Sequence, residues 1–174
     1  NRKPAILRMT DRIKENKTIK EIWLATGKAK INNKLESLFS NTKIKVFRGD
    51  DDDVLSRFIE ISKISKADII IRLTGDCPLV DPKIIDETVE LLINKKADYA
   101  SNILNRTFPD GLDVEVFTKR TLLETGEHSE AGFSREHVTT YMHGFHKNKY
   151  KKGNFKKVSL EHSSDFSHLR WTLD

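Results

Sequence analysis

Cysteine is almost absent from the sequence: Cys77 is the single one among 174 residues. One cysteine cannot form an intramolecular disulfide, and the chain has neither a Cys-x-x-Cys pair nor the Cys/His spacing of a zinc site. This pattern excludes disulfide scaffolds and thiolate zinc domains, and it fits a protein of the reducing cytoplasm best.

Long hydrophobic runs are also absent. No uninterrupted apolar stretch approaches the ~18 residues that span a bilayer, and no charged-then-apolar signal segment opens the sequence. We therefore expect a soluble, cytoplasmic protein without a membrane partner. With 37% hydrophobic residues and a length typical of one domain, residues 1–174 are expected to form a single domain with its own core.

The net charge is modest, +5 at pH 7. Much of the positive excess lies in one run near the C-terminus, which contains Lys147, Lys149, Lys151, Lys152, Lys156 and Lys157. Nucleic-acid binding would need aromatic residues interleaved with the basic ones on one face, and only Tyr150 and Phe155 are available. We interpret the run as a solvated segment and expect no nucleic-acid partner.

Two kinds of hydrophobic pattern alternate along the chain. Strands are predicted at residues 22–25, 44–47, 68–73, 99–101, 112–117, 158–160 and 169–172. Helices are predicted to start at Pro4 and Pro82, and at residues 35–39, 54–64, 120–127 and 134–146. Strands separated by helices favour right-handed crossovers, so we expect an α/β fold with a mainly parallel sheet, mixed in direction toward its end.

Acidic loops follow two of the predicted strands, RGDDDD after residues 44–47 and TGDCPLVDP after residues 68–73. In open α/β sheets, ligands bind beyond the carboxyl ends of the strands. Asp76 lies between Gly75 and Cys77 in the second loop, and a carboxylate in this position suits Mg²⁺ bound to phosphates. The alternative is that Asp76 only caps a turn.

Two later segments are unusually polar. Alternation over Leu112–Phe117 places Asp113 and Glu115 on one face, which an ordinary half-exposed strand would turn toward water. Arg135 opens the predicted helix 134–146 and places a positive charge at its start. The histidines, including His143 and His146, show no third ligand, so we assign them no metal.

Six motifs occur in sequence, namely RGDDDDVLSRF, IIIRLTGDCPLVDP, ADYASN, RTFPDGLDVEVF, REHVT and RWTLD. Their order and spacing resemble those of the spore coat polysaccharide biosynthesis cytidylyltransferases, which are related to the acylneuraminate and 3-deoxy-manno-octulosonate cytidylyltransferases. The resemblance covers nearly the whole chain. It implies a three-layer nucleotide-sugar-transferase (nucleotide-diphospho-sugar transferase) fold with a mixed sheet.

The resemblance also implies a reaction, in which a hydroxyl of an acidic sugar attacks the α-phosphate of CTP and pyrophosphate leaves. Mg²⁺ would be the cofactor, held by Asp76 and Asp174. CTP and an acidic surface-polysaccharide sugar would be the partners, and a homodimer with PDGLDVEVF at its interface is expected.

Site roles follow from the resemblance residue by residue. The catalytic candidates are Asp76 and Arg135. The nucleotide-binding candidates are Asp53, Arg57, Thr74 and Gly75, where Asp53 could equally be a helix cap and Arg57 a surface ion-pair partner. The sugar-binding candidates are Arg106, Asp110, Gly111, Asp113 and Glu115.

The start of the chain departs from the family pattern. Relatives begin with a strand and a loop of the form QARxxSxRLPxK, which holds the triphosphate, whereas NRKPAILRMTDRI resembles the helix after that loop. We therefore expect a domain truncated at the N-terminus and also at the C-terminus, and inactive as given. Two other functions stay open: a binding or assembly module without turnover, and a glycosyltransferase whose DxD-type motif would be GDDDD.

Overall fold

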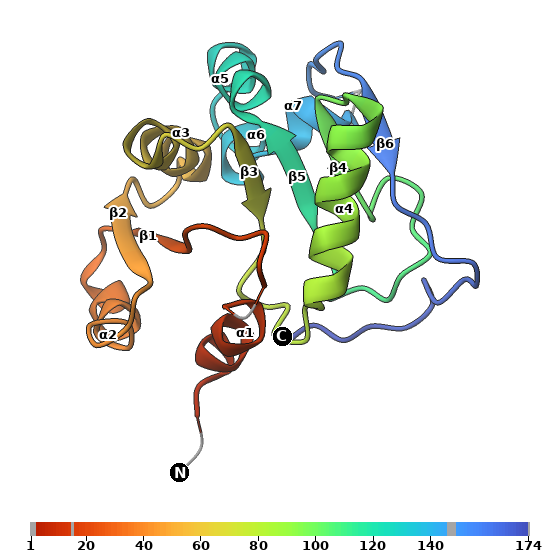
Figure 1. Ribbon diagram of the computed structural model, residues 1–174. Helices are drawn as coiled ribbons and strands as arrows, with labels where there is room; N and C mark the ends of the chain where they lie inside the picture. The colour runs from red at the N-terminus through yellow and green to blue at the C-terminus, as the bar shows by residue number, and fades with distance from the viewer. Residues whose placement is uncertain (1–2, 15, 146–148, 174) are drawn as a thin grey trace. The chain divides into compact units, whose positions relative to one another are not determined.

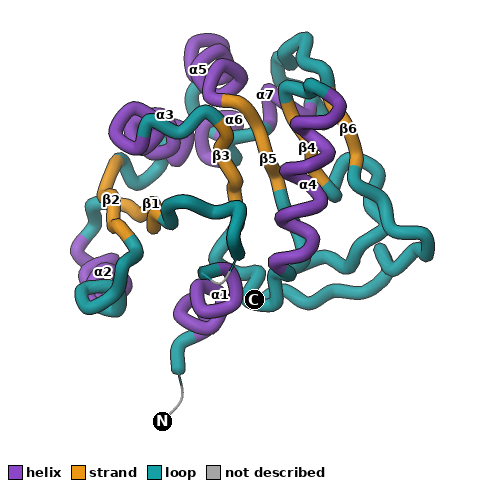
Figure 2. Tube along the Cα trace, in the orientation of Figure 1, coloured by secondary structure: helices purple, strands orange, loops and turns teal. Residues whose placement is uncertain are grey.

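The computed structural model describes residues 3–14, 16–145 and 149–173 (Figures 1 and 2). The chain divides into two compact units. Unit 1 comprises Asn1–Lys20, Ile69–Phe117 and Lys156–Asp174, and unit 2 comprises Glu21–Asp68 and Thr118–Phe155. Among the described residues, no helix has the length and apolar character required to cross a membrane.

Unit 1 is built on a four-stranded sheet. Its elements are α1 (Ala5–Ile13), β3 (Ile69–Arg72), α4 (Pro82–Lys95), β4 (Tyr99–Ser101), β5 (Glu115–Thr118), which leads into unit 2, and β6 (Lys157–Ser159). The strand order is β3-β5-β4-β6, with β4 antiparallel to β5 and parallel to β6. The long helix α4 packs against β4 and β6 (Figure 1). The mixed α/β sheet that the sequence predicts is confirmed.

Helix α4 begins and ends as its sequence indicates. Asp81 is the N-cap, its side chain accepts a hydrogen bond from the backbone N–H of Lys83 at 2.9 Å, and Pro82 is the first helical residue. Lys96, in the left-handed conformation, ends the helix. The buried side chains are Ile84, Ile85, Thr88, Val89 and Leu92. Ile93 is 52% exposed because it lies on the solvent side of this stripe.

Unit 2 contains a two-stranded parallel sheet and most of the short helices (Figure 2). Its elements are β1 (Trp23–Gly27), the 3₁₀ helix η1 (Lys30–Asn32), α2 (Asn33–Ser37), β2 (Lys45–Gly49), α3 (Val54–Ser65), α5 (Lys119–His128), α6 (Phe133–Glu136) and α7 (Thr140–His143). Helix α3 packs against both strands and against α5. The strands of the chain therefore form two sheets, one in each unit, where the sequence suggested one.

Two predicted elements need correction. The helix expected at residues 134–146 is interrupted, because Val138 is fully buried with a φ of 59° that no α-helix accommodates. The strand expected at 169–172 forms a single isolated parallel bridge between Asp110 and Arg170. The isoleucines of β3 are only partly buried because β3 is the terminal strand of its sheet.

Candidate active site

Three segments of unit 1 meet around Asp76. The loop after β3 is closed by a hydrogen bond from the Cys77 N–H to the Thr74 carbonyl, at 3.1 Å. The backbone N–H of Leu173 donates to the Asp76 carbonyl at 2.8 Å, and the N–H of Trp171 donates to the Asp110 carbonyl at 2.6 Å. The C-terminal segment is therefore hydrogen-bonded both to the Asp76 loop and to the loop that carries Asp110.

The carboxylate of Asp76 is exposed, and its one hydrogen-bond partner among the described residues is the thiol of Cys77, with Sγ 3.7 Å from Oδ1. The environment of that thiol is also acidic. The pKa of Cys77 is raised to about 11, chiefly by burial and also by the charges of Asp76 and Asp113, while the hydrogen bond with Thr74 acts in the opposite direction. The carboxylates of Asp76 and Asp113 thus lie close enough to act on the same sulfur.

A divalent cation fits this donor set. Asp76 is a hard oxygen donor without a cationic side-chain partner among the described residues, which is the type of ligand that Mg²⁺ uses together with phosphates and water. Asp174, the second predicted ligand, lies outside the described residues, although it directly follows Leu173. Among the described residues there is no group of three or more His, Cys, Asp or Glu side chains that could hold a metal. An ion at Asp76 would therefore take most of its ligands from elsewhere.

Gly111 is required by close packing of the backbone. Its φ is +105°, and a Cβ atom built there would lie 2.7 Å from the carbonyl carbon of Trp171 and 2.9 Å from the N atom of Thr172. Neither backbone atom can move without breaking the hydrogen bonds of the C-terminal segment. The predicted sugar-binding residue Gly111 therefore has a structural reason to be glycine.

A series of ion pairs lies beside the contact between Gly111 and the C-terminal segment. The Arg106 guanidinium binds both oxygens of Asp113, at 2.7 and 2.8 Å, and the hydrogen bonds with Asp113 raise the pKa of Arg106. Asp110 lies 3.7 Å from Arg106 and 3.6 Å from Arg170, whose Nε donates to Thr172 Oγ1. Arg170 is not among the predicted site residues, although it belongs to the RWTLD motif. The predicted residues Arg106, Asp110, Gly111 and Asp113 do lie together.

The environment of Glu115 differs from the half-exposed strand face that the sequence suggested. Its side chain is only 4% exposed, it forms an ion pair with Arg72, and it accepts a hydrogen bond from the Tyr99 hydroxyl at 2.6 Å. The polar face of this strand is therefore covered, not turned toward water. Burial and the negative charge of Glu115 raise the pKa of Tyr99 well above its usual value. The carboxylate of Glu115 therefore links β5 to β3 through Arg72 and to β4 through Tyr99.

In unit 2, two other predicted residues are paired. Asp53 is the N-cap of α3, with Oδ1 accepting from the Ser56 N–H at 2.9 Å, as the helix-cap alternative predicts. The Nε of Arg135 donates to Asp53 Oδ2 at 2.7 Å, and its Nη1 donates to the Gly126 carbonyl at 3.0 Å. Two motifs far apart in the sequence, RGDDDD and REHVT, thus meet through one ion pair.

Arg57 belongs to α3, and its side chain packs against the loop that precedes this helix. It is only 8% exposed, and it donates hydrogen bonds to the backbone carbonyls of Asp50, at 2.6 Å, and Asp51. It is not the surface ion-pair partner that the sequence suggested. Asp50 Oδ1 accepts the backbone N–H groups of Asp52 and Asp53, each at 2.9 Å, and these bonds lower the pKa of Asp50.

Arg48 is a structural residue that the sequence did not reveal. It donates to the carbonyls of Gly27, Lys28 and Ala29, and also to the side chains of Asn33 and Glu36. It thereby fixes the loop after β1, next to the loop after β2. An arginine within a strand carries no signal for such a role.

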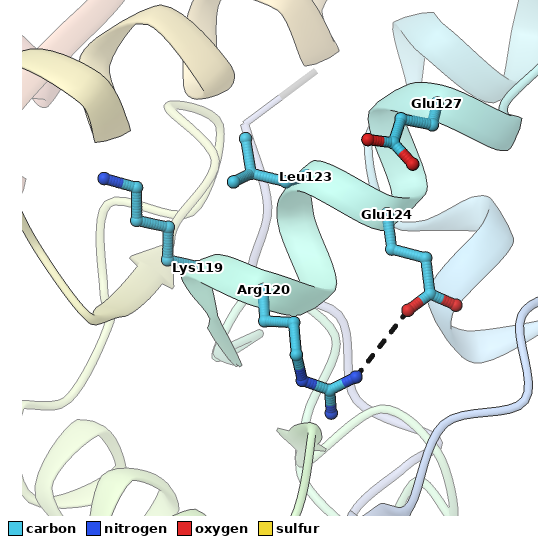
Figure 3. Close-up of a pocket in the computed structure, with 5 residues that line it drawn as sticks. All are labelled: Lys119, Arg120, Leu123, Glu124 and Glu127. Atoms are coloured by element: carbon cyan, nitrogen blue, oxygen red, sulfur yellow. Dashed lines mark ion pairs between the residues drawn. The ribbon is translucent and has the colours of Figure 1, made fainter.

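Figure 3 shows a shallow depression in unit 2 that is lined by Lys119, Arg120, Leu123, Glu124 and Glu127. All five side chains come from the one helix α5, and Arg120 pairs with Glu124 at 3.6 Å. None of the predicted site residues lines it. The depression therefore adds nothing to the site.

Comparisons with known proteins identify the family to which the chain belongs. A family model described as cytidylyltransferase matches residues 1–168. A solved cytidylyltransferase from Leptospira borgpetersenii serovar Hardjo-bovis is 30% identical and superposes with a TM-score of 0.90, covering 100% of this chain and 71% of that one.

Two of the relatives that match in sequence illustrate the similarity. An uncharacterized protein of Methanocaldococcus jannaschii is 36% identical over 78% of this chain and 54% of its own length. The spore coat polysaccharide biosynthesis protein SpsF of Bacillus subtilis is 33% identical over 68% of this chain and 49% of its own length. The chain thus spans about half the length of the curated relatives that it matches.

Proposed function

The chain belongs to the cytidylyltransferase family, and from that premise we propose that it takes part in the transfer of CMP from CTP to an acidic sugar of surface-polysaccharide synthesis, with release of pyrophosphate. The family resemblance of the sequence is confirmed, since the match to the family spans residues 1–168 and so covers five of the six motifs, all but RWTLD. The acidic nature of the sugar, the homodimer and Mg²⁺ are parts of the proposal.

The observation that carries the proposal is the meeting of the Asp76 loop, the Asp110 loop and the C-terminal segment in unit 1. The hydrogen bonds from Leu173 to Asp76 and from Trp171 to Asp110 join these segments. The Asp76 loop follows β3, the Asp110 loop precedes β5, and the C-terminal segment follows β6, so an exposed carboxylate and a row of charged side chains border one region. Such an arrangement can receive an anionic nucleotide on one side and a hydroxyl-rich ligand on the other.

We infer that Asp76, with Asp174, holds Mg²⁺. When bound, the ion would neutralise charge on the phosphates of CTP and on the leaving pyrophosphate. Thr74 and Gly75 would shape the loop on the nucleotide side. The polar groups of Arg106, Asp110 and Asp113 would meet the sugar, while Gly111 lets the C-terminal segment pass close by.

The two alternative functions have less support. For a glycosyltransferase, the GDDDD run would have to present carboxylates to a metal, but those of Asp51 and Asp53 are bound to the Ala29 N–H and to Arg135. A binding module without turnover could still bind CTP with Mg²⁺, but it would release no pyrophosphate. A pyrophosphate-release assay with CTP and candidate sugars therefore separates the enzyme from the module.

The test is a thermal shift screen with CTP, UTP, GTP and ATP, each with and without Mg²⁺. We expect CTP with Mg²⁺ to raise the melting temperature most, since a ligand at ~100 times its Kd adds about 2.7 kcal/mol to the free energy of unfolding. Asp76→Asn should abolish the Mg²⁺-dependent part of the shift with little change in the melting temperature of the free protein. Equal shifts with all four nucleotides would refute the cytidylyltransferase function. A large loss of stability in Asp76→Asn would make Asp76 a turn residue only.

The homodimer has its own measurement. Light scattering of the chain after size exclusion should give twice the mass of 20.1 kDa. A monomer at all concentrations would remove this part of the proposal without affecting the rest.

A further inference from the structure

The guanidinium of Arg135 is held entirely by contacts within unit 2. Its Nε lies 2.7 Å from Asp53 Oδ2 and its Nη1 lies 3.0 Å from the Gly126 carbonyl oxygen. Its side chain is 22% exposed. The positive charge of Arg135 is therefore already neutralised by Asp53. An anionic substrate would have to compete with this carboxylate in order to bind Arg135 directly.

Asp53 passes the effect of Arg135 to the loop before α3. Its two carboxylate oxygens are divided, with Oδ2 on Arg135 and Oδ1 on the Ser56 N–H at the start of the helix. Its own backbone N–H donates to Asp50 Oδ1 at 2.9 Å. A shift of the Asp53 side chain therefore disturbs both the helix start and the position of Asp50.

The loop needs such a restraint because Asp50, Asp51, Asp52 and Asp53 are consecutive and repel one another. Arg57 restrains it from inside, by binding backbone carbonyls. Among the described residues, the salt bridge between Arg135 and Asp53 is the one that involves a carboxylate of Asp50–Asp53. The loop follows β2, which is parallel to β1, and so it lies at the edge where α/β sheets bind ligands.

We propose that Arg135 is a positioning residue: through Asp53 it fixes the loop Asp50–Asp53, and so it sets the affinity for the nucleotide without touching it. The inference rests on the proposed function, and it replaces the catalytic role that the sequence suggested for Arg135. It accounts for the occurrence of both RGDDDD and REHVT in one chain, since each supplies one partner of the pair.

The first experiment does not depend on any activity. In a hydrogen-exchange measurement on the full chain, the backbone amides of Asp52, Asp53 and Ser56 should exchange at least ten times faster in Arg135→Met than in the wild type. Arg120→Met is the matched control, because Arg120 also belongs to unit 2 and pairs with a carboxylate, Glu124, at 3.6 Å on exposed α5 (Figure 3). Unchanged exchange in Arg135→Met, or an equal change in the control, would overturn the proposal.

The second experiment separates positioning from direct contact with phosphate. By calorimetry, Arg135→Met should weaken the binding of CTP and of cytidine by the same factor, about tenfold, and Arg135→Lys should restore part of it. Asp53→Asn should weaken binding similarly, and the double variant should be no worse than either single one. If Arg135→Met weakened the binding of CTP but not that of cytidine, or if Asp53→Asn bound CTP more tightly than the wild type, Arg135 would contact the phosphates. If the wild type binds no CTP, the proposed function fails, while the exchange result still decides the role of Arg135 in the loop.

Discussion

Two acidic loops follow hydrophobic strands in this chain, and the structure uses their carboxylates in opposite ways. In unit 2, the carboxylates of Asp50, Asp51 and Asp53 accept backbone N–H groups, and Asp53 also binds Arg135. In unit 1, the described partner of the exposed Asp76 carboxylate is a thiol, with Sγ at 3.7 Å. The carboxylates of the unit 2 loop have partners within that unit, whereas the Asp76 carboxylate in unit 1 has no cationic side-chain partner among the described residues.

The pKa shifts show the same contrast. Two backbone N–H groups lower the pKa of Asp50, because they stabilise its charged form. Next to Asp76, burial and two nearby carboxylates raise the pKa of Cys77 to about 11. A run of aspartates in the sequence therefore does not by itself indicate a metal site, since the arrangement of N–H donors and arginines decides which carboxylate remains available.

The largest loss of stability is expected from a substitution inside the sheet of unit 1. Arg72→Met leaves Glu115 charged, 4% exposed and without its cation, and loss of one partner of a buried ion pair typically costs about 3–5 kcal/mol. Urea unfolding should show this loss in the free energy of unfolding. The double variant Arg72→Met, Glu115→Gln should recover much of it, because no unpaired charge remains. A loss below about 1 kcal/mol in the single variant would mean that water reaches Glu115.

A somewhat smaller effect is expected at Gly111. Alanine there must adopt a φ of +105° and place its Cβ 2.7 Å from the carbonyl carbon of Trp171, so we expect a loss of about 3 kcal/mol. Gly132 is the control in unit 2, because its φ is +81° but no atom lies within 4 Å of the added Cβ. Gly132→Ala should cost about 1 kcal/mol. Equal losses in the two variants would show that the C-terminal segment does not pass as closely as described.

These contacts explain which parts of the molecule could be predicted. Helix α4 and its cap at Asp81 follow from local patterns, and so does β4, which the sequence placed at residues 99–101. The break at Val138 was missed, because burial of that side chain by residues distant in sequence outweighs the helical pattern. The motifs brought Arg106, Asp110, Gly111 and Asp113 together correctly, whereas the burial of Glu115 depends on Arg72 and Tyr99 from neighbouring strands.

Burial of Cys77, together with the charges of Asp76 and Asp113, makes the stability of unit 1 depend on pH. Because the pKa of Cys77 rises from 9.0 to about 11 on folding, its contribution to stability is fully present below pH 9 and is lost as the pH rises through 11. The loss should reach about 2 kcal/mol at pH 11. Comparing wild type with Cys77→Ala between pH 8 and 11 isolates this contribution from other groups, since the difference between the two should shrink over that range. A constant difference would mean that the thiol titrates normally.

The smallest effect is expected at Gly27, which is the counterpart of Gly111 in unit 2. A Cβ atom at Gly27 would lie 1.9 Å from Asp51 Oδ1, but this obstacle is the end of an exposed side chain that can rotate away. Gly27→Ala should therefore cost only about 1 kcal/mol, the value of the hydrogen bonds between Asp51 and the Ala29 N–H. Asp51→Ala should cost about the same, and the double variant no more than either, because both changes remove one interaction. Losses that add up, or a loss as large as that of Gly111→Ala, would show that the loop of unit 2 is as rigid as the backbone contact of unit 1.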